Sequence, residues 1–284
     1  MGEILYRPGG RKLCWTEFGE RDGAAVVYLH GTPRSRLSAP PPEALAGVRL
    51  ITFDRPGYGR SDPVRRPSLT GVADDVLALG KSLGLKRFAV VGFSGGAPYA
   101  LACGVRAAGQ ISAIAAVALT GPAWELNTLS AKEKRDIIRL RLLPGAARGF
   151  VRHHAAWYAT DPTRMHASSD DPRDEEAAAA REGARQGSIG LESDWFATDL
   201  RSWGFRLADV RVPTLIWAGR KDAGRAVPDA EPVAARIPRS SVRIADDCGH
   251  PTCSQAQRSR PATGCTPGSA GWSRSMRAGP PTRS

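Results

Sequence analysis

Residues 92–96 read Gly-Phe-Ser-Gly-Gly, and the apolar run 88–91 comes immediately before them. A helical pattern begins after the last glycine, so the serine lies at a turn between a strand and a helix. A serine at such a turn has a positive φ, and the positions two before and two after it must be small for the strand and helix to pass. The pattern therefore predicts a nucleophile elbow, with Ser94 as the nucleophile and Gly92 and Gly96 as the small positions.

A glycine-rich turn before a helix can instead bind phosphate. Such a site requires G-x-G-x-x-G for a dinucleotide, or Gly-Lys-Ser/Thr for a P-loop, and neither follows the run 88–91. The nucleophile is the favoured interpretation of this turn.

Hydrolysis by a serine requires N–H donors for the oxyanion that forms on the attacked carbonyl group. The residue after the nucleophile supplies one donor, which is the backbone N–H of Gly95. The second should lie on a loop after an earlier strand, where residues 30–33 read His-Gly-Thr-Pro. Thr32 is the natural donor, because Pro33 has no N–H, and we expect His30 to be structural.

Where a nucleophile elbow connects a strand and a helix of an α/β sheet, the base of the Ser-acid-His triad comes last in chain order. His250 follows a predicted strand in the sequence Cys248-Gly249-His250. The other histidines after Ser94 fall in a helical stretch, where a surface or lid role is expected. His250 is therefore the predicted base. The three in the helical stretch are His153, His154 and His166.

Asp222 is the leading candidate for the acid of the triad. It lies on the loop after a predicted core strand and 28 residues before His250. Asp246 and Asp247 are too close in sequence to His250 to be its usual partner, although either is a fallback. Asp229 is expected to belong to the next helix.

These residues need a sheet to position them. Short apolar runs bounded by turn residues alternate with helical patterns, which predicts an α/β fold: a mostly parallel, doubly wound sheet flanked by helices. Two weaker strands at 4–6 and 13–17 should form an antiparallel edge. The main strands are predicted at 25–29, 50–53, 88–92, 114–119, 214–218 and 242–244, with helices at about 69–83 and 97–107.

After the predicted strand 114–119 the alternation stops, and only helical patterns follow until about residue 208. We predict that residues 122–207 are a helical cap inserted into an α/β core made of 1–121 and 208–250. The tail 251–284 contains no Leu, Ile, Val or Phe, so it cannot bury enough apolar surface to offset its ordering entropy. We expect this tail to be disordered.

One helix of the cap has a clear beginning and end. Ser130 and Glu133 have the spacing of a capping box before an amphipathic run. Pro144 should end or kink that helix.

Composition limits the setting of the protein. The chain has 284 residues, 42% of them hydrophobic, without a stretch near the roughly 20 apolar residues that a membrane helix needs. The five cysteines lack the paired spacing of a zinc site or a disulfide framework. We therefore expect a cytoplasmic protein that does not associate with membranes.

The formal net charge of +12 suggests a nucleic-acid partner at first sight. Five arginines of this excess lie in the last 34 residues, and residues 122–208 balance thirteen basic against thirteen acidic side chains. No basic run with interleaved aromatics appears. We expect a small-molecule substrate and no nucleic-acid partner, and the sequence leaves the oligomeric state open.

Six motifs follow one another along the chain: HGTP at 30–33, DRPGYGRSD at 54–62, GFSGGAPYA at 92–100, WGF at 203–205, VPTLIWAGRKD at 212–222 and DDCGH at 246–250. Over roughly residues 10–252 the chain resembles the α/β-hydrolase superfamily, specifically its bacterial members with a helical cap. The resemblance implies a triad of Ser94, Asp222 and His250, with Gly95 and Thr32 as oxyanion donors.

The same resemblance implies that the loop 54–62 shapes the site and that Asp54 is not catalytic. Members of the family follow the catalytic histidine with an apolar helix that covers the sheet. Here residues 251–252 lead instead into the Arg/Ser/Pro-rich tail. We hypothesise a reading-frame disruption late in the gene, which would leave the loop of His250 less well held.

The sequence thus predicts a serine hydrolase that forms an acyl-enzyme on a small carboxylic ester, without a metal or organic cofactor. A serine at position 94 argues against haloalkane dehalogenase and epoxide hydrolase chemistry, which use a carboxylate nucleophile. Thioesterase, lactonase, C–C hydrolase and haloperoxidase-like activities stay open, because fold and triad do not fix the substrate. A ligand-binding protein with impaired catalysis is the alternative outside enzymes.

Overall fold

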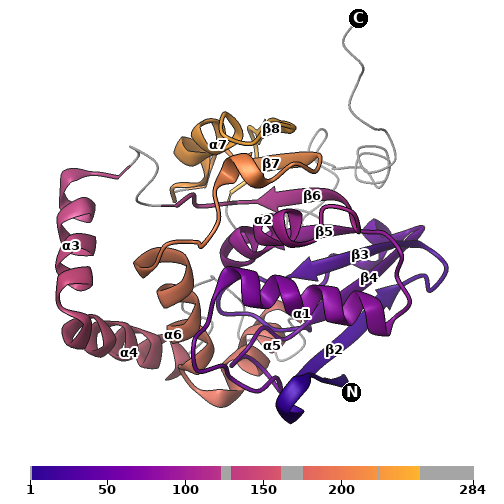
Figure 1. Cartoon of the computed structure of the whole chain (residues 1–284), viewed down its shortest axis with the longest axis horizontal. Helices are drawn as coiled ribbons and strands as arrows, with labels where there is room; N and C mark the ends of the chain where they lie inside the picture. The colour runs from indigo at the N-terminus through magenta and orange to yellow at the C-terminus, as the bar shows by residue number, and fades with distance from the viewer. Residues whose placement is uncertain (1, 123–128, 161–174, 223, 250–284) are drawn as a thin grey trace, which may run out of the picture.

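The computed structural model describes residues 2–122, 129–160, 175–222 and 224–249 (Figure 1). These residues form an eight-stranded sheet in the order β1-β2-β4-β3-β5-β6-β7-β8. The pairs β1–β2 and β2–β4 are antiparallel, and every other neighbouring pair is parallel. The mostly parallel sheet with an antiparallel edge is therefore confirmed. Its strands are β1 (Glu3–Tyr6), β2 (Lys12–Gly19), β3 (Ala24–Leu29), β4 (Val48–Phe53), β5 (Phe88–Phe93), β6 (Ile111–Val117), β7 (Thr214–Gly219) and β8 (Ser240–Ala245).

Helices cover the sheet, and the described residues between β6 and β7 are mostly helical. Helix α1 packs on α2, and α2 packs on β5 and β6, so the elbow lies at the centre of the fold. The helices are α1 (Leu69–Ser82), α2 (Ala97–Arg106), α3 (Ala131–Leu142), α4 (Pro144–Thr160), α5 (Glu175–Gly183), α6 (Ile189–Trp195) and α7 (Ala226–Ala234). Short 3-10 or π turns are η1 (Pro8–Gly10), η2 (Pro42–Leu45), η3 (Ser94–Gly96), η5 (Ala184–Gln186), η6 (Phe196–Leu200) and η7 (Leu207–Asp209).

Local sequence accounts for the main elements. All residues of β5 except Phe93 are buried, as expected for a central parallel strand with both faces covered. Ser68 caps α1 by accepting a hydrogen bond from the Gly71 N–H. The capping box of Ser130 and Glu133 is present at the start of α3, as predicted.

The prediction for strand 114–119 was wrong at both ends. Strand β6 begins at Ile111, which pairs with Phe88 before a register shift in the ladder, and this irregular start obscures the apolar pattern. The strand ends at Val117 because Ala118 has φ of +51°, outside the extended region.

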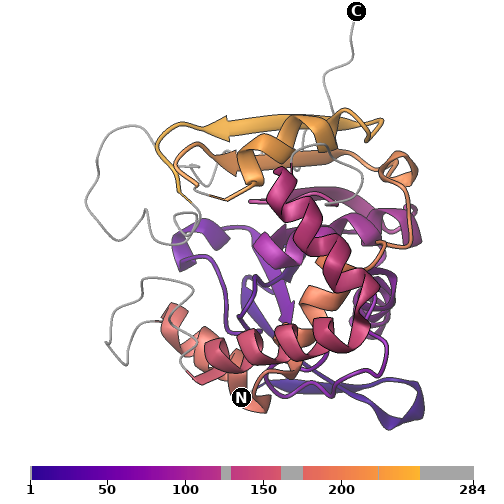
Figure 2. The same ribbon diagram turned by 90° about the vertical axis from the view of Figure 1, so that its left-hand side faces the viewer.

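The inserted helices form a separate layer beside the sheet. In Figure 1 helices α3, α4 and α6 lie to the left of the strands, and in Figure 2 α3 and α4 lie in front of them. Leu142 ends α3 and Pro144 begins α4, so the helix ends where the proline predicts. The division into core and cap agrees with this arrangement but stays a prediction, as does the cap boundary at 122–207. The tail 251–284 lies outside the described residues.

Candidate active site

Ser94 lies on the turn between β5 and α2. Its φ of +50° is in the left-handed region that non-glycine residues rarely adopt. A side-chain carbon at Gly92 would come 2.5 Å from the Gly96 carbonyl oxygen, and one at Gly96 would come 2.2 Å from the Leu29 oxygen. Both positions therefore have to be glycine for strand, turn and helix to pack this closely.

The loops that carry the two predicted oxyanion donors lie against each other. A side-chain carbon at Gly95 would be 3.5 Å from the Thr32 nitrogen and 2.2 Å from its Oγ1. A carbon at Gly31 would be 3.4 Å from the Ser94 Cβ. The structure thus brings Thr32, Gly95 and Ser94 together, although their chemical roles stay a prediction.

His30 is fully buried beneath this pair of loops. Its Nδ1 lies 2.8 Å from the Gly31 carbonyl oxygen, and its Nε2 accepts the Arg55 backbone N–H at 3.2 Å. Burial, followed by the charge of Arg55, holds the pKa of His30 well below its usual value. A neutral ring with Nδ1 as the donor satisfies both contacts, which fits the structural role expected for it.

The acid end of the predicted triad follows β7. Asp222 is 9% exposed, and its Oδ1 accepts the Gly224 N–H at 2.8 Å. The chain that leads toward residue 250 runs beside this loop, because the Lys221 N–H donates to the Cys248 carbonyl oxygen at 2.9 Å. His250 itself lies outside the described residues, so the pairing of Asp222 with His250 stays a prediction.

The other aspartates near this end have different surroundings. Asp246 and Asp247 have side chains that are 74% and 73% exposed, and they form ion pairs with Arg220 and Lys221. Asp229 belongs to α7, as predicted, and its Oδ2 accepts the Gly121 N–H at 2.8 Å. Asp222 is therefore the buried carboxylate on the loop that follows β7.

A buried cluster lies beside the loops of the two predicted oxyanion donors, residues 30–33 and 94–96, which are called the oxyanion loops below. The sequence analysis missed this cluster. Asp194 on α6 accepts hydrogen bonds from Arg55 Nη1 and Nη2, both at 2.9 Å. The hydroxyl groups of Tyr58, at 2.6 Å, and Tyr99, at 2.7 Å, donate to the same carboxylate. Thr32 donates to it as well, through Oγ1. One carboxylate of the inserted helices thus joins the oxyanion loop to the segment 54–62 and to α2.

The geometry of the elbow agrees with a match to a family model. The model of the alpha/beta hydrolase fold matches residues 24–256. The chain belongs to the alpha/beta hydrolase fold family. Its eight-stranded sheet, with Ser94 on the turn after β5, is the arrangement in which this family of enzymes carries a nucleophile.

Named relatives of this alpha/beta hydrolase include several enzymes. The 3-oxoadipate enol-lactonase 1 of Acinetobacter baylyi is 21% identical over 239 residues, which is 84% of this chain and 86% of that protein. A non-heme chloroperoxidase of Streptomyces lividans is 35% identical over 103 residues, 34% of this chain and 36% of that protein. Among solved structures, an esterase from Exiguobacterium antarcticum has a TM-score of 0.65 at 20% identity, over 98% of this chain and all of that one.

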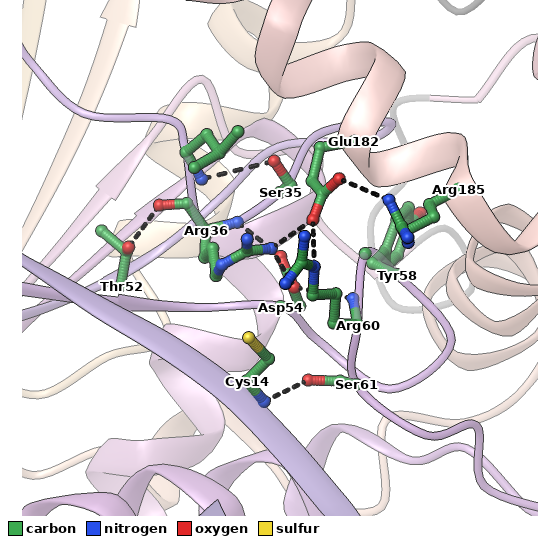
Figure 3. Close-up of polar contacts among 12 residues, drawn as sticks. Cys14, Ser35, Arg36, Thr52, Asp54, Tyr58, Arg60, Ser61, Glu182 and Arg185 are labelled. Carbon is green, nitrogen blue, oxygen red and sulfur yellow. Dashed lines mark hydrogen bonds and ion pairs between the residues drawn. The ribbon is translucent and has the colours of Figure 1, made fainter. Parts of the chain in front are cut away.

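The loop 54–62 of the hydrolase is held by its own aspartate. Asp54 accepts the backbone N–H groups of Arg36, at 2.7 Å, and Arg60, at 2.9 Å, as well as Arg36 Nη1 at 2.8 Å. Figure 3 shows Arg36 between Asp54 and Glu182, which comes from α5. Asp54 is fully buried among these donors, which agrees with the structural role that the resemblance implies.

Three further observations concern the hydrolase as far as the structure describes it. Its described residues hold no group of three or more His, Cys, Asp or Glu that could bind a metal ion. None of the helices resolved in those residues is long and apolar enough to cross a membrane. Three cysteines of the described chain are buried and form no disulfide with one another, Cys14, Cys103 and Cys248.

Proposed function

We propose that this hydrolase cleaves a small carboxylic ester, with Ser94 as the nucleophile. The observation that supports this most directly is the strained φ of Ser94 on the β5–α2 turn, next to the paired loops of Thr32 and Gly95. Strain of this kind persists only where the surrounding structure enforces it, and it concentrates at functional sites.

In the proposed mechanism His250 removes the proton from Ser94 Oγ as the oxygen attacks the ester carbonyl carbon. The N–H groups of Thr32 and Gly95 stabilise the oxyanion, each worth about 3 to 4 kcal/mol in comparable hydrolases. The C–O bond to the alcohol then breaks, and His250 passes its proton to the leaving oxygen. Water attacks the acyl-enzyme in the same way and releases the carboxylic acid.

Asp222 has the task of orienting His250 and stabilising its protonated form. Its burial after β7 and the contact between Lys221 and Cys248 support this assignment, because they bring the two loops together. The proposed reaction involves no metal or organic cofactor.

A cyclic ester is the second candidate substrate. The relative named as an enol-lactonase aligns with 84% of this chain, which makes lactones worth testing beside open esters. The bond broken is the same, so the same residues would serve.

The test is turnover of p-nitrophenyl acetate and of a simple lactone by the wild type, by Ser94→Ala and by Ser82→Ala. Ser82 is an exposed serine at the end of α1 and serves as a matched control. We expect Ser94→Ala to lower kcat at least about 10³-fold and Ser82→Ala to leave it unchanged. Activity that survives Ser94→Ala would exclude Ser94 as the nucleophile.

Labelling with a fluorophosphonate gives a second readout, independent of the ester chosen. The wild type should be labelled on Ser94, and His250→Ala should react far more slowly. A folded wild-type protein that resists labelling would mean that the triad is not assembled.

A further inference from the structure

The guanidinium group of Arg55 contacts both loops that carry the predicted oxyanion donors. Nη1 donates to the Gly95 carbonyl oxygen at 3.1 Å. Nη2 donates to Thr32 Oγ1 at 3.2 Å and, at 3.4 Å, to the Gly31 carbonyl oxygen. Arg55 therefore ties the loop after β3 to the elbow after β5.

The contact at the Gly31 carbonyl group also fixes the direction of the Thr32 N–H. The Gly31 carbonyl and the Thr32 N–H belong to the same planar peptide unit, so the direction of one determines the direction of the other. His30 Nδ1 and Arg55 Nη2 both contact that carbonyl oxygen. Donors on the carbonyl oxygen also polarise the N–H of the same peptide.

Arg55 can keep this position only while its charge is balanced. Its side chain is 1% exposed, and a buried cation without a partner is strongly unfavourable. Asp194 supplies the balancing charge through two hydrogen bonds from the guanidinium group. Burial, together with the charge of Asp194, raises the pKa of Tyr58 and of Tyr99 well above the usual range, so both hydroxyl groups stay protonated and donate to Asp194.

The position of Asp194 depends in turn on how α6 packs against the core. A side-chain carbon at Gly190 would lie 2.7 Å from the Tyr58 ring, so the helix backbone rests directly on that ring. Gly57 approaches the same turn of α6, because a carbon there would be 3.2 Å from the Gly190 nitrogen. The carboxylate is thus delivered by a helix in close contact with the loop 54–62.

We propose that Asp194 is a positioning residue for the oxyanion hole. Through Arg55 it holds the Thr32 N–H in place and ties the backbone at Gly95 to the Thr32 loop, so the hole is complete only when α6 is docked on the core. This inference rests on the ester hydrolysis proposed above and assigns to the inserted helices a part in its transition state.

The test compares Asp194→Asn with the wild type on a p-nitrophenyl ester, with Glu182→Gln as the matched control. Glu182 also joins the inserted helices to a buried arginine, but its described partners include Arg36 and Arg60 and not Arg55, Thr32 or Gly95. We expect Asp194→Asn to lower kcat by about 10- to 100-fold with KM changed less than about 3-fold, since removing one oxyanion donor outright costs 10²- to 10³-fold. Glu182→Gln should leave both constants unchanged.

A trifluoromethyl ketone separates positioning from general damage, because its adduct with the serine carries the oxyanion. Its inhibition constant should rise in Asp194→Asn by the same factor by which kcat/KM falls. Tyr99→Phe removes one hydrogen bond but keeps the charge balance, and it should show a smaller loss of about 2- to 5-fold with the same pattern. It also serves if Asp194→Asn does not fold.

Hydrogen exchange gives a readout that does not depend on turnover. The peptides that contain Thr32 and Gly95 should exchange faster in Asp194→Asn, while those from β5 and β6 should not. Equal kcat, equal inhibition and equal exchange in folded Asp194 variants would overturn the inference. If Ser94→Ala retains the wild-type rate, the proposed function itself fails, and the exchange of these peptides alone decides the positioning role.

Discussion

Arg55 and Arg36 are both buried arginines that join the inserted helices to the core, but they contact different loops of that core. Arg55 pairs with Asp194 and also contacts the loops around Gly31 and Gly95. Arg36 pairs with Asp54 within the core and with Glu182 of α5, and its contacts fasten the loop 54–62 (Figure 3). Under the proposals made above, Arg55 supports the chemistry of the site, whereas Arg36 serves docking and stability.

The two arginines differ in whether they keep a counter-charge when the carboxylate from the inserted helices is removed. Without Asp194, Arg55 is buried without a counter-charge next to the oxyanion loops. Without Glu182, Arg36 still has Asp54 at 2.8 Å. Stability and activity measurements on the two clusters should therefore separate, and the following changes are ordered by the expected effect on the free energy of unfolding.

The largest effect is expected for Asp54→Ala. This change removes the acceptor of two backbone N–H groups and of the Arg36 guanidinium group; both Arg36 contacts are buried, and the contact with the Arg60 N–H is partly buried. Breaking a buried pair from one side costs about 3 to 5 kcal/mol, and urea unfolding followed by circular dichroism measures it.

The control is Asp62→Ala, which removes a single exposed contact with the Lys12 N–H. It should cost less than about 1 kcal/mol. If Asp54→Ala and Asp62→Ala destabilise the protein equally, the Asp54 cluster does not hold the loop 54–62.

Gly190→Ala should come next. Its new methyl group would lie 2.7 Å from the Tyr58 ring, so α6 must shift away from the core, and overpacking of this kind costs about 1 to 3 kcal/mol. Because α6 carries Asp194, this variant should also lose activity. Calorimetry and steady-state kinetics on the same preparation measure both.

Gly149→Ala is the matched control for this change. Gly149 lies in α4, and a side-chain carbon there meets nothing within 4 Å. The alanine should raise stability by about 0.5 to 1 kcal/mol through helix propensity and leave kcat unaltered. A Gly190→Ala protein with wild-type stability and kcat would contradict the close docking of α6.

Much of the core could be predicted from local patterns. Gly92 and Gly96 predict a tight turn, because only small residues let the strand and the helix pass this closely. The apolar runs of β3, β5 and β7 fall at the predicted places. The carboxyl ends of parallel strands meet at one edge of the sheet, so the places of Ser94 after β5 and of Asp222 after β7 could be predicted from their positions in the chain. Their roles in catalysis stay a prediction. Strand β6 shows the limit, because a shift in pairing moved its start.

The cluster around Asp194 could not be predicted in this way. Arg55 and Asp194 are 139 residues apart in the sequence, and no local pattern states which distant helix will carry the counter-charge. One weak signal was available: Asp194 lies on a helical stripe with Gly190, Leu191 and Ala197, all buried, and an acid on an apolar stripe requires a partner.

A smaller change in the free energy of unfolding is expected when the pH is lowered. It is caused by His30, which is buried next to Arg55, and it therefore tests the surroundings of Arg55. Burial and then the charge of Arg55 depress the pKa of His30 below its usual value of 6.5. The folded state keeps the ring neutral, whereas the unfolded chain binds a proton below about pH 6.5. The stabilising contribution is therefore complete above pH 6.5 and is lost as the pH falls, by at most about 1.4 kcal/mol per pH unit.

Urea unfolding of the wild type and of His30→Gln between pH 7.5 and 5 measures this slope. The glutamine does not titrate, so the variant should lose less stability over that range, whatever its stability at pH 7.5. Parallel curves for the two proteins would show that His30 does not bind its proton selectively in the unfolded state.

The smallest effect is expected for Glu182→Gln, and it sharpens the comparison most. Glu182 has a side chain that is 14% exposed, and the glutamine keeps an acceptor for Arg36, which also retains Asp54. The free energy of unfolding should fall by about 1 kcal/mol or less, and kcat should stay at the wild-type value.

Combined with Asp194→Asn, the stability losses should add, because the two carboxylates share no partner in the described contacts. The kcat of the double variant should equal that of Asp194→Asn alone. A further drop in kcat would mean that Arg36 and Glu182 also act on the oxyanion loops, and the division between a docking arginine and a catalysis-supporting arginine would be wrong.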